Sequence, residues 1–199
     1  MRLILASQSP RRRELLTAAG YAFEVIVPHE SVEAGGPGEE RTEDYVARLA
    51  DAKAADVANQ IASHPESFVI IACDTVADCD GLILEKPRDR AHAEEMLRLL
   101  SGRAHRVVSG LCVRLHPSGT SETRTAVSEL TMQTLSEAML QGYLDSGAWE
   151  GKSGAFGFQD DLPWLELTSG TAENVVGLPM DVLADMLRTL IRSDENNVS

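Results

Sequence analysis

Three consecutive arginines, residues 11–13, follow a serine-rich turn near the start of the chain. A helix beginning at Pro10 would place all three in its first turn, where the helix dipole favours acidic side chains instead. The arrangement is explained if an anion such as phosphate binds there, held by free backbone N–H groups, guanidinium groups and the hydroxyls of Ser7 and Ser9. The alternative is an exposed basic helix end whose side chains point into water.

A second unusual cation is Lys53, which falls on the apolar stripe of a predicted helix that Thr42 caps and that runs to about Ile61. It lies four residues from both Leu49 and Val57, so its side chain is predicted to face inward. Burying an ammonium without a partner is costly. Either the stem packs and the amine reaches water, or the amine reaches into a polar cleft.

The strongest predicted strand is the apolar run that begins at Phe68 and is predicted to end on Asp74 and Thr75. A run that is apolar on both faces is typical of a central strand. Ligands of open α/β sheets gather at the carboxyl ends of strands. Asp74 is therefore a candidate general base or metal ligand, and the alternative is a turn cap.

Two further lysines occur in predicted loops, Lys86 before a helix and Lys152 in a glycine-rich stretch. The spacing of that stretch is not that of a P-loop. A loop over residues 28–41 carries Glu33. Cations that neutralise phosphate oxygens, together with carboxylates that hold Mg²⁺ or Mn²⁺, match the needs of a triphosphate with a divalent metal.

The elements that would position these residues alternate between strands and helices, which indicates an α/β fold. No linker or internal repeat divides the chain, so residues 1–192 are predicted to form one domain of two interwoven lobes. Residues 193–199 are polar and are predicted to be a disordered tail.

Composition limits the classes of partner. The formal net charge of −13 argues against a nucleic-acid or anionic membrane surface. No apolar run reaches membrane-spanning length, and the three cysteines lack metal-ligand spacing. These features predict a cytoplasmic protein with reduced thiols.

Several motifs, in one order along the chain, resemble the Maf family of nucleoside triphosphate pyrophosphatases. They are residues 5–16, 74–75, 85–89, 100–105, 151–159 and 175–179. The resemblance covers about residues 3–190. It implies a Maf or inosine-triphosphatase-like fold, with a long mixed central sheet, flanking helices and a cleft between two lobes. It also implies hydrolysis to the monophosphate and pyrophosphate with Mg²⁺ or Mn²⁺, and a homodimer.

Carried over residue by residue, the resemblance makes Asp74 the catalytic acid/base. It links Arg11, Thr75 and Gln159 to the choice of substrate, and this combination is that of the branch acting on dTTP and UTP. Phosphate-facing positions fall on Arg12, Lys53, Lys86 and Lys152.

One departure concerns the metal. The family usually has two adjacent acidic residues after the second strand, whereas Ser31-Val32-Glu33 stands here. Glu33 is the best match and, with Asp74, the expected metal ligand. Two alternatives remain open at this point: a nucleotide-binding regulator with little turnover, and a branch that prefers 7-methyl-GTP or another purine nucleotide.

Overall fold

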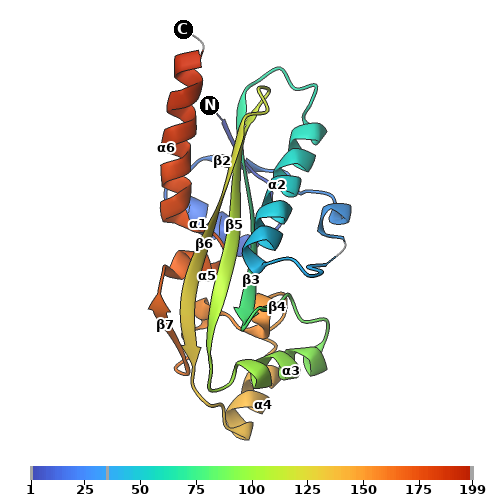
Figure 1. The fold of residues 1–199 in the computed structure, drawn as a ribbon, viewed down its shortest axis with the longest axis vertical. Helices are drawn as coiled ribbons and strands as arrows, with labels where there is room; N and C mark the ends of the chain where they lie inside the picture. The colour runs from blue at the N-terminus through green and yellow to red at the C-terminus, as the bar shows by residue number, and fades with distance from the viewer. Residues whose placement is uncertain (1, 35, 198–199) are drawn as a thin grey trace.

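The fold is built on one mixed sheet, seven-stranded in the computed structural model, which describes residues 2–34 and 36–197. The strand order is β2-β1-β3-β5-β6-β7, and the short β4 pairs with β3 off this path. The pairs of β1 with β2 and β3 are parallel, and the other pairs are antiparallel. The predicted α/β fold with a long mixed sheet is confirmed (Figure 1). The strands are β1 Arg2–Leu5, β2 Phe23–Val25, β3 Phe68–Cys79, β4 Leu82–Leu84, β5 Ala104–His116, β6 Ser121–Met132 and β7 Leu165–Ser169.

The strand predicted to end at Asp74 continues to Cys79, so that boundary was wrong. Antiparallel β5 pairs with β3 from Phe68 to Asp78 and keeps its backbone hydrogen-bonded throughout. On the other flank, β1 ends at Leu5 opposite Ile71, and the chain turns away. Asp74 therefore lies in the middle of β3, close beyond the point where the strand loses its parallel neighbour.

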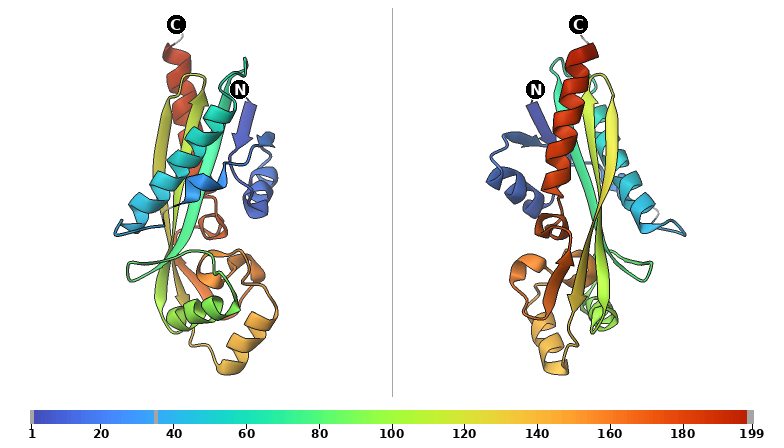
Figure 2. Two further views of the ribbon diagram at one scale, coloured as in Figure 1. Left: turned by 90° about the vertical axis from the view of Figure 1, so that its right-hand side faces the viewer. Right: turned by 60° about the vertical axis from the view of Figure 1, so that its left-hand side comes forward.

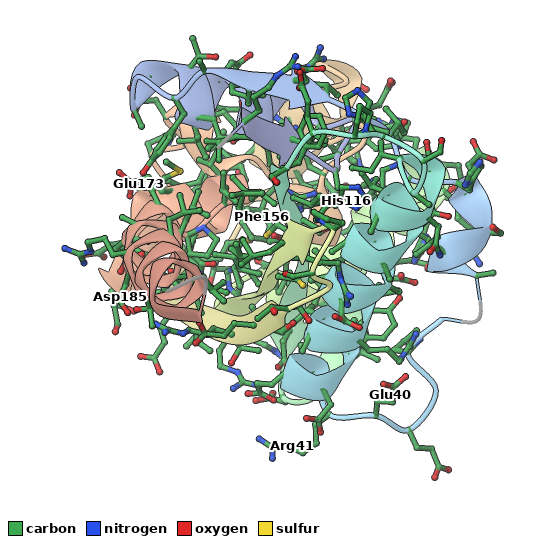
Figure 3. The ribbon with its side chains drawn as sticks, turned by 90° about the horizontal axis from the view of Figure 1, so that it is seen from above. Glu40, Arg41, His116, Phe156, Glu173 and Asp185 are labelled. Atoms are coloured by element: carbon green, nitrogen blue, oxygen red, sulfur yellow. The ribbon has the colours of Figure 1, made fainter. Side chains whose placement is uncertain are left out.

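Helices cover both faces of the sheet. The long α2 lies on one face and α6 on the other, with β5 and β6 between them (Figures 1 and 3). Looking down the long axis, Figure 3 shows Asp185 of α6 and the Glu40–Arg41 segment before α2 on opposite sides. The helices are α1 Pro10–Ala18, α2 Thr42–Gln60, α3 Arg90–Leu100, α4 Glu137–Asp145, α5 Ala172–Val176 and α6 Met180–Asn197.

The apolar core is divided along the length of the molecule. One buried cluster packs α3 and α4 against the far ends of β3, β5 and β6, and includes Leu97, Trp149 and Trp164. Two others pack α6 and α1 on one face of the sheet and α2 on the opposite face, around Leu183 and Ile70. The strands β3 and β5 pass through both ends (Figure 2).

The start of α2 differs from the prediction that Thr42 caps it. Arg41 occupies the cap position, and Thr42 donates its hydroxyl hydrogen bond to Asp78 of β3. The prediction of a tail over residues 193–199 stays a prediction, as does the single domain over 1–192. The helix α6 extends to Asn197, and residues 198 and 199 lie outside the described part of the chain.

Asp78 offers a test of how the helix is fixed to the sheet. Its side chain, 2% exposed, accepts hydrogen bonds from Thr42, from the Gly81 N–H at 3.1 Å and from Arg106 at 2.9 Å. Burial alone raises the pKa of Asp78, but these hydrogen bonds and the Arg106 charge outweigh it and lower the pKa below its ordinary value. We expect Asp78→Asn to destabilise the protein by about 1–3 kcal/mol at pH 7.

The pH dependence checks the cause of that loss. A carboxyl with a lowered folded-state pKa contributes stability above its unfolded pKa, and that contribution is lost as pH falls through the folded value. The melting temperature of the wild type should therefore fall more steeply than that of the variant below about pH 4. Equal melting temperatures at pH 7 would contradict a structural role for this carboxylate.

Candidate active site

A cavity of about 470 Å³ opens beside the middle of β3. Its walls come from the turn between β1 and α1, from α2, from the loop before α2, and from residues 150–159 and 175–177. Every residue to which the sequence assigned a site role lines it; Arg13, the third of the consecutive arginines, does not. The lining residues of that set are Ser7, Ser9, Arg11, Arg12, Glu33, Lys53, Asp74, Thr75, Lys86, Lys152 and Gln159.

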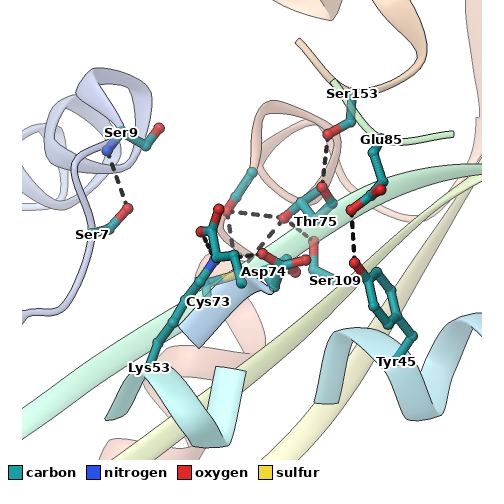
Figure 4. A network of polar contacts seen from close by, with 12 residues as sticks. Ser7, Ser9, Tyr45, Lys53, Cys73, Asp74, Thr75, Glu85, Ser109 and Ser153 are labelled. Atoms are coloured by element: carbon teal, nitrogen blue, oxygen red, sulfur yellow. Dashed lines mark hydrogen bonds and ion pairs between the residues drawn. The ribbon is translucent and has the colours of Figure 1, made fainter. Parts of the chain in front are cut away.

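Lys53 lies between two carboxylates at the inner end of the cavity. Its ammonium is 2.6 Å from Asp74 Oδ1 and 2.6 Å from Glu33 Oε1. The side chain of Lys53 is only 6% exposed, that of Asp74 14% and that of Glu33 48%. The lysine on the apolar stripe of α2 therefore reaches a polar cleft rather than bulk water. Figure 4 shows the ammonium directed at Asp74.

The two acids reach Lys53 from different directions. Asp74 projects from the rigid centre of β3, whereas Glu33 lies in a short 3₁₀ turn, Glu30–Glu33. The loop before this turn is fixed to α2, because the His29 N–H donates to Asp56 Oδ2 at 3.0 Å and Gln60 donates to the Val27 carbonyl at 3.1 Å.

The charge of Glu33 is set by this neighbourhood. Partial burial raises the pKa of Glu33, but the hydrogen bond from Lys53 and the positive charges of Lys53, Lys86 and Arg12 lower it by more, so the net shift is downward. Glu33 is thus a carboxylate at neutral pH. Lys86, whose positive charge contributes to this downward shift of the Glu33 pKa, also lines the cavity.

Arg12 links three segments of the wall. It donates from Nε to the Gly177 carbonyl at 2.7 Å, from Nη1 to Ser7 Oγ at 3.1 Å and from Nη2 to Thr75 Oγ1 at 3.3 Å. Thr75 Oγ1 also lies 2.8 Å from Ser109 Oγ on the neighbouring strand. The guanidinium is therefore positioned by side chains and a carbonyl at the side of the cavity.

The opposite wall is a loop in contact with both α1 and β3. Arg11 donates to the Gly151 carbonyl at 3.1 Å, and Ser153 donates to the Thr75 carbonyl at 2.9 Å. Burial, followed by the charge of neighbouring Arg12, lowers the pKa of Arg11. Two adjacent guanidinium groups thus repel each other beside the cavity, and an anion bound there would relieve that repulsion.

Comparison with known proteins identifies the family. The family model described as "Maf-like protein" matches residues 2–190. The dTTP/UTP pyrophosphatase of Rhodopirellula baltica is 46% identical over 194 residues, which cover 97% of this chain and 84% of that protein. The protein of the same name from Salmonella typhimurium is 41% identical over 179 residues, covering 89% of this chain and 87% of that protein. The chain belongs to the Maf family.

Among solved structures, the nucleoside-triphosphatase, also titled dITP/XTP pyrophosphatase, of Mycobacterium abscessus aligns over 100% of this chain and 98% of its own. The sequence identity is 16% and the TM-score 0.42, so this similarity bears on neither the site nor the reaction.

Some contacts of this Maf site were not foreseen from the sequence. Ser109 faces Thr75 because the two are register partners of β5 and β3, which no local pattern reveals. The hydroxyl of buried Tyr45 donates to Glu85 at 2.7 Å, beside Lys86. Gly177 lies within one of the motifs that resemble the family, but no role was predicted for it. Its carbonyl accepts a hydrogen bond from Arg12.

The fit of a divalent metal follows from the acids present. In the described part of the chain, no group of three or more His, Cys, Asp or Glu side chains comes together. Glu33 and Asp74 do converge on a single ammonium. Mg²⁺ is commonly held by one or two carboxylates, with substrate phosphates and water completing its shell. This donor set therefore fits a metal that arrives with a triphosphate.

None of the described helices combines the length and the apolar character needed to cross a membrane.

Proposed function

We propose that this Maf protein hydrolyses dTTP and UTP to the nucleoside monophosphate and pyrophosphate. The observation that supports this most is the Lys53-bound Asp74, which lies in a cavity lined by Arg11, Arg12 and Lys86. Its relatives named dTTP/UTP pyrophosphatase match nearly the whole chain. The cations suit a triphosphate, and the carboxylate suits proton transfer from water.

In the proposed reaction, a water oxygen forms a bond to the α-phosphorus. The bond from that phosphorus to the bridging oxygen of the β-phosphate breaks, and pyrophosphate leaves. Asp74 accepts a proton from the attacking water. Lys53 fixes the direction of the Asp74 carboxylate through their 2.6 Å contact. Arg12 and Lys86 stabilise the negative charge that grows on the leaving oxygens.

Glu33 and Asp74 are the residues that would hold a divalent cation, Mg²⁺ or Mn²⁺. When bound, such an ion supplies Lewis-acid polarisation of the phosphoryl oxygens. Because Glu33 and Asp74 both contact Lys53, the Lys53 ammonium and the bound ion would share the negative charge of the two carboxylates. The contact of Glu33 with Lys53 counts against the regulator alternative, whose only support was the altered sequence around Glu33.

The same proposal places the protein in the cytoplasm, as a homodimer, with no nucleic-acid or membrane partner. The cytoplasmic location rests on composition and the dimer on the resemblance to the family.

A panel of nucleoside triphosphates with Mg²⁺ or Mn²⁺ tests the function, with pyrophosphate, orthophosphate and monophosphate measured separately. We expect pyrophosphate and monophosphate, and the highest kcat/KM with dTTP and UTP. Orthophosphate with a diphosphate would move the attack to the γ-phosphorus. A preference for GTP, 7-methyl-GTP or ITP would refute the branch but not the reaction, and binding without turnover would favour the regulator.

Gln159 carries the prediction on specificity. Its amide offers a donor and an acceptor to a pyrimidine edge, and it lines the cavity. Replacement by Leu should lower the ratio of kcat/KM for UTP to that for GTP by about 5- to 150-fold, which corresponds to roughly 1–3 kcal/mol of discrimination. Gln8→Leu, in the turn between β1 and α1 that lines the same cavity, is the matched control and should leave this ratio unchanged. An unchanged ratio in Gln159→Leu would remove the residue from base recognition.

A further inference from the structure

The loop that carries Gln159 consists of two halves that are fixed differently. The first half is held to β3 and to the turn after β4: Ser153 donates to the Thr75 carbonyl at 2.9 Å, and the Gly154 N–H donates to the Glu85 carbonyl at 3.1 Å. The second half contains the 3₁₀ turn Phe158–Asp160, and Gln159 is its central residue. One ion pair in the described part of the chain joins the halves, between Lys152 and Asp160.

This ion pair, which we call the clasp, is largely shielded from water. The Lys152 side chain is 12% exposed and that of Asp160 25%. Surface ion pairs contribute little because solvent screens them and the side chains lose entropy. A clasp with this degree of burial fixes its two ends more firmly than an exposed pair does.

The clasp passes directly over the backbone of Gly157. A Cβ added at Gly157 would overlap Lys152 Nζ and Asp160 Oδ2, and would lie 2.8 Å from Lys152 Cε. Any residue other than glycine would have to displace the ion pair. Gly157 has an ordinary backbone conformation, with φ −125° and ψ 115°, so a side chain is excluded by the clasp and not by backbone strain.

Gln159 itself has no hydrogen-bond partner among the described residues, and its side chain is exposed to the cavity. Its direction therefore depends on the backbone of the 3₁₀ turn. The clasp fixes that turn at Asp160, the next residue. The family resemblance assigned Lys152 to phosphate binding. In this structure Lys152 is instead paired with Asp160, the residue next to Gln159.

We propose that Asp160 is a positioning residue for nucleobase selection, which acts through Lys152 to hold Gln159 in place. The inference rests on the proposed function for the identity of the base. The alternative is that Lys152 binds the substrate's phosphates directly. In that case Asp160 competes with the triphosphate for the lysine, and its removal should strengthen binding of every nucleotide alike.

The test compares Asp160→Asn with Asp161→Asn. Both remove one negative charge, but Asp161 is exposed and lies outside the clasp. Asp161 has φ 53°, a left-handed conformation that Asn tolerates. We expect Asp160→Asn to lower the ratio of kcat/KM for UTP over GTP by roughly 5- to 10-fold, the effect of one weakened hydrogen bond. Inhibition by inorganic tripolyphosphate should change less than about twofold. Asp161→Asn should change neither.

Two further variants separate the clasp from a general effect on folding. Gly157→Ala leaves both charges in place but displaces the clasp, and should lower the UTP/GTP ratio as Asp160→Asn does. Lys152→Met combined with Asp160→Asn should be no worse in this ratio than either single change, because the two residues act as one unit. Gly142→Ala, at an open position of α4, is the matched glycine control.

Each outcome decides the inference. An equal change in kcat/KM for all nucleotides, or tighter inhibition by tripolyphosphate in Asp160→Asn, would overturn it and favour the phosphate role. An unchanged ratio would also overturn it. If the wild type releases no pyrophosphate, the proposed function fails separately. The clasp is then still tested by the ratio of dissociation constants for UMP and GMP.

Discussion

Replacing Asp74 with Asn is expected to lower kcat/KM for UTP by roughly 10²–10⁴-fold, the usual contribution of a general base. The change keeps the size of the side chain but removes the basic oxygen and the charge that faces Lys53 at 2.6 Å. The steady-state rate of pyrophosphate release measures the loss. Binding of UTP should be partly retained, because Arg11, Arg12 and Lys86 are still present.

Asp80→Asn is the control for that experiment. Its side chain, 85% exposed, lies just beyond the end of β3 and outside the described active-site cavity. We expect wild-type kinetics from it. The melting temperature of Asp74→Asn separates a chemical from a structural role, since the loss of rate should far exceed any loss of folded protein. An active Asp74→Asn protein would make Asp74 a structural residue of β3 only.

Replacing Gly110 with Ala is expected to have the largest effect on stability. A Cβ at Gly110 would overlap the Val46 carbonyl and lie 2.6 Å from the Ala47 nitrogen, both on the backbone of α2. Backbone atoms cannot swing aside as a flexible side chain does. Overpacking a core typically costs about 1–3 kcal/mol and occasionally more, and a clash with a helix backbone belongs at the upper end.

Thermal unfolding measures this prediction. For a chain of this size, 1 kcal/mol corresponds to roughly 2–4 °C, so we expect a fall of about 6–12 °C or a loss of soluble protein. Any folded variant should also lose activity, since displacing α2 moves Lys53 away from Asp74. Gly142→Ala is the control: nothing lies near that position, and alanine favours a helix. Equal melting temperatures of wild type and Gly110→Ala would show that α2 moves freely on the sheet.

Periodicity and local signals predicted the elements and several site residues. The 3.6-residue helical repeat predicted that Lys53 faces inward, and its four-residue spacing from both Leu49 and Val57 was enough for that prediction. Asp89 and Ser136 are of residue types that commonly cap helix N-termini, and each accepts a backbone hydrogen bond at the start of α3 or α4. These features depend on residues close in sequence.

Contacts between strands and loops that are distant in sequence could not be predicted from such local patterns. The end of β3 was wrongly placed at Asp74, because the polar pair Asp74-Thr75 is typical of a boundary when the pairing of β5 is unknown. Likewise, the partner of Thr75 on β5 follows from the register alone. The clasp required the path of the loop over Gly157, which composition does not determine.

The continuity of β3 and β5 has a mechanical consequence. Their 12 and 13 residues form one ladder through both ends of the molecule, and the cavity opens beside its middle. A hinge at that level would have to break paired backbone hydrogen bonds in two adjacent strands at once. The two halves of the protein are therefore joined by a stiff pair of hydrogen-bonded strands. Adjustment around a nucleotide is left to segments beside this ladder such as the turn bearing Glu33, whose side chain is 48% exposed, since the clasp fixes the loop bearing Gln159.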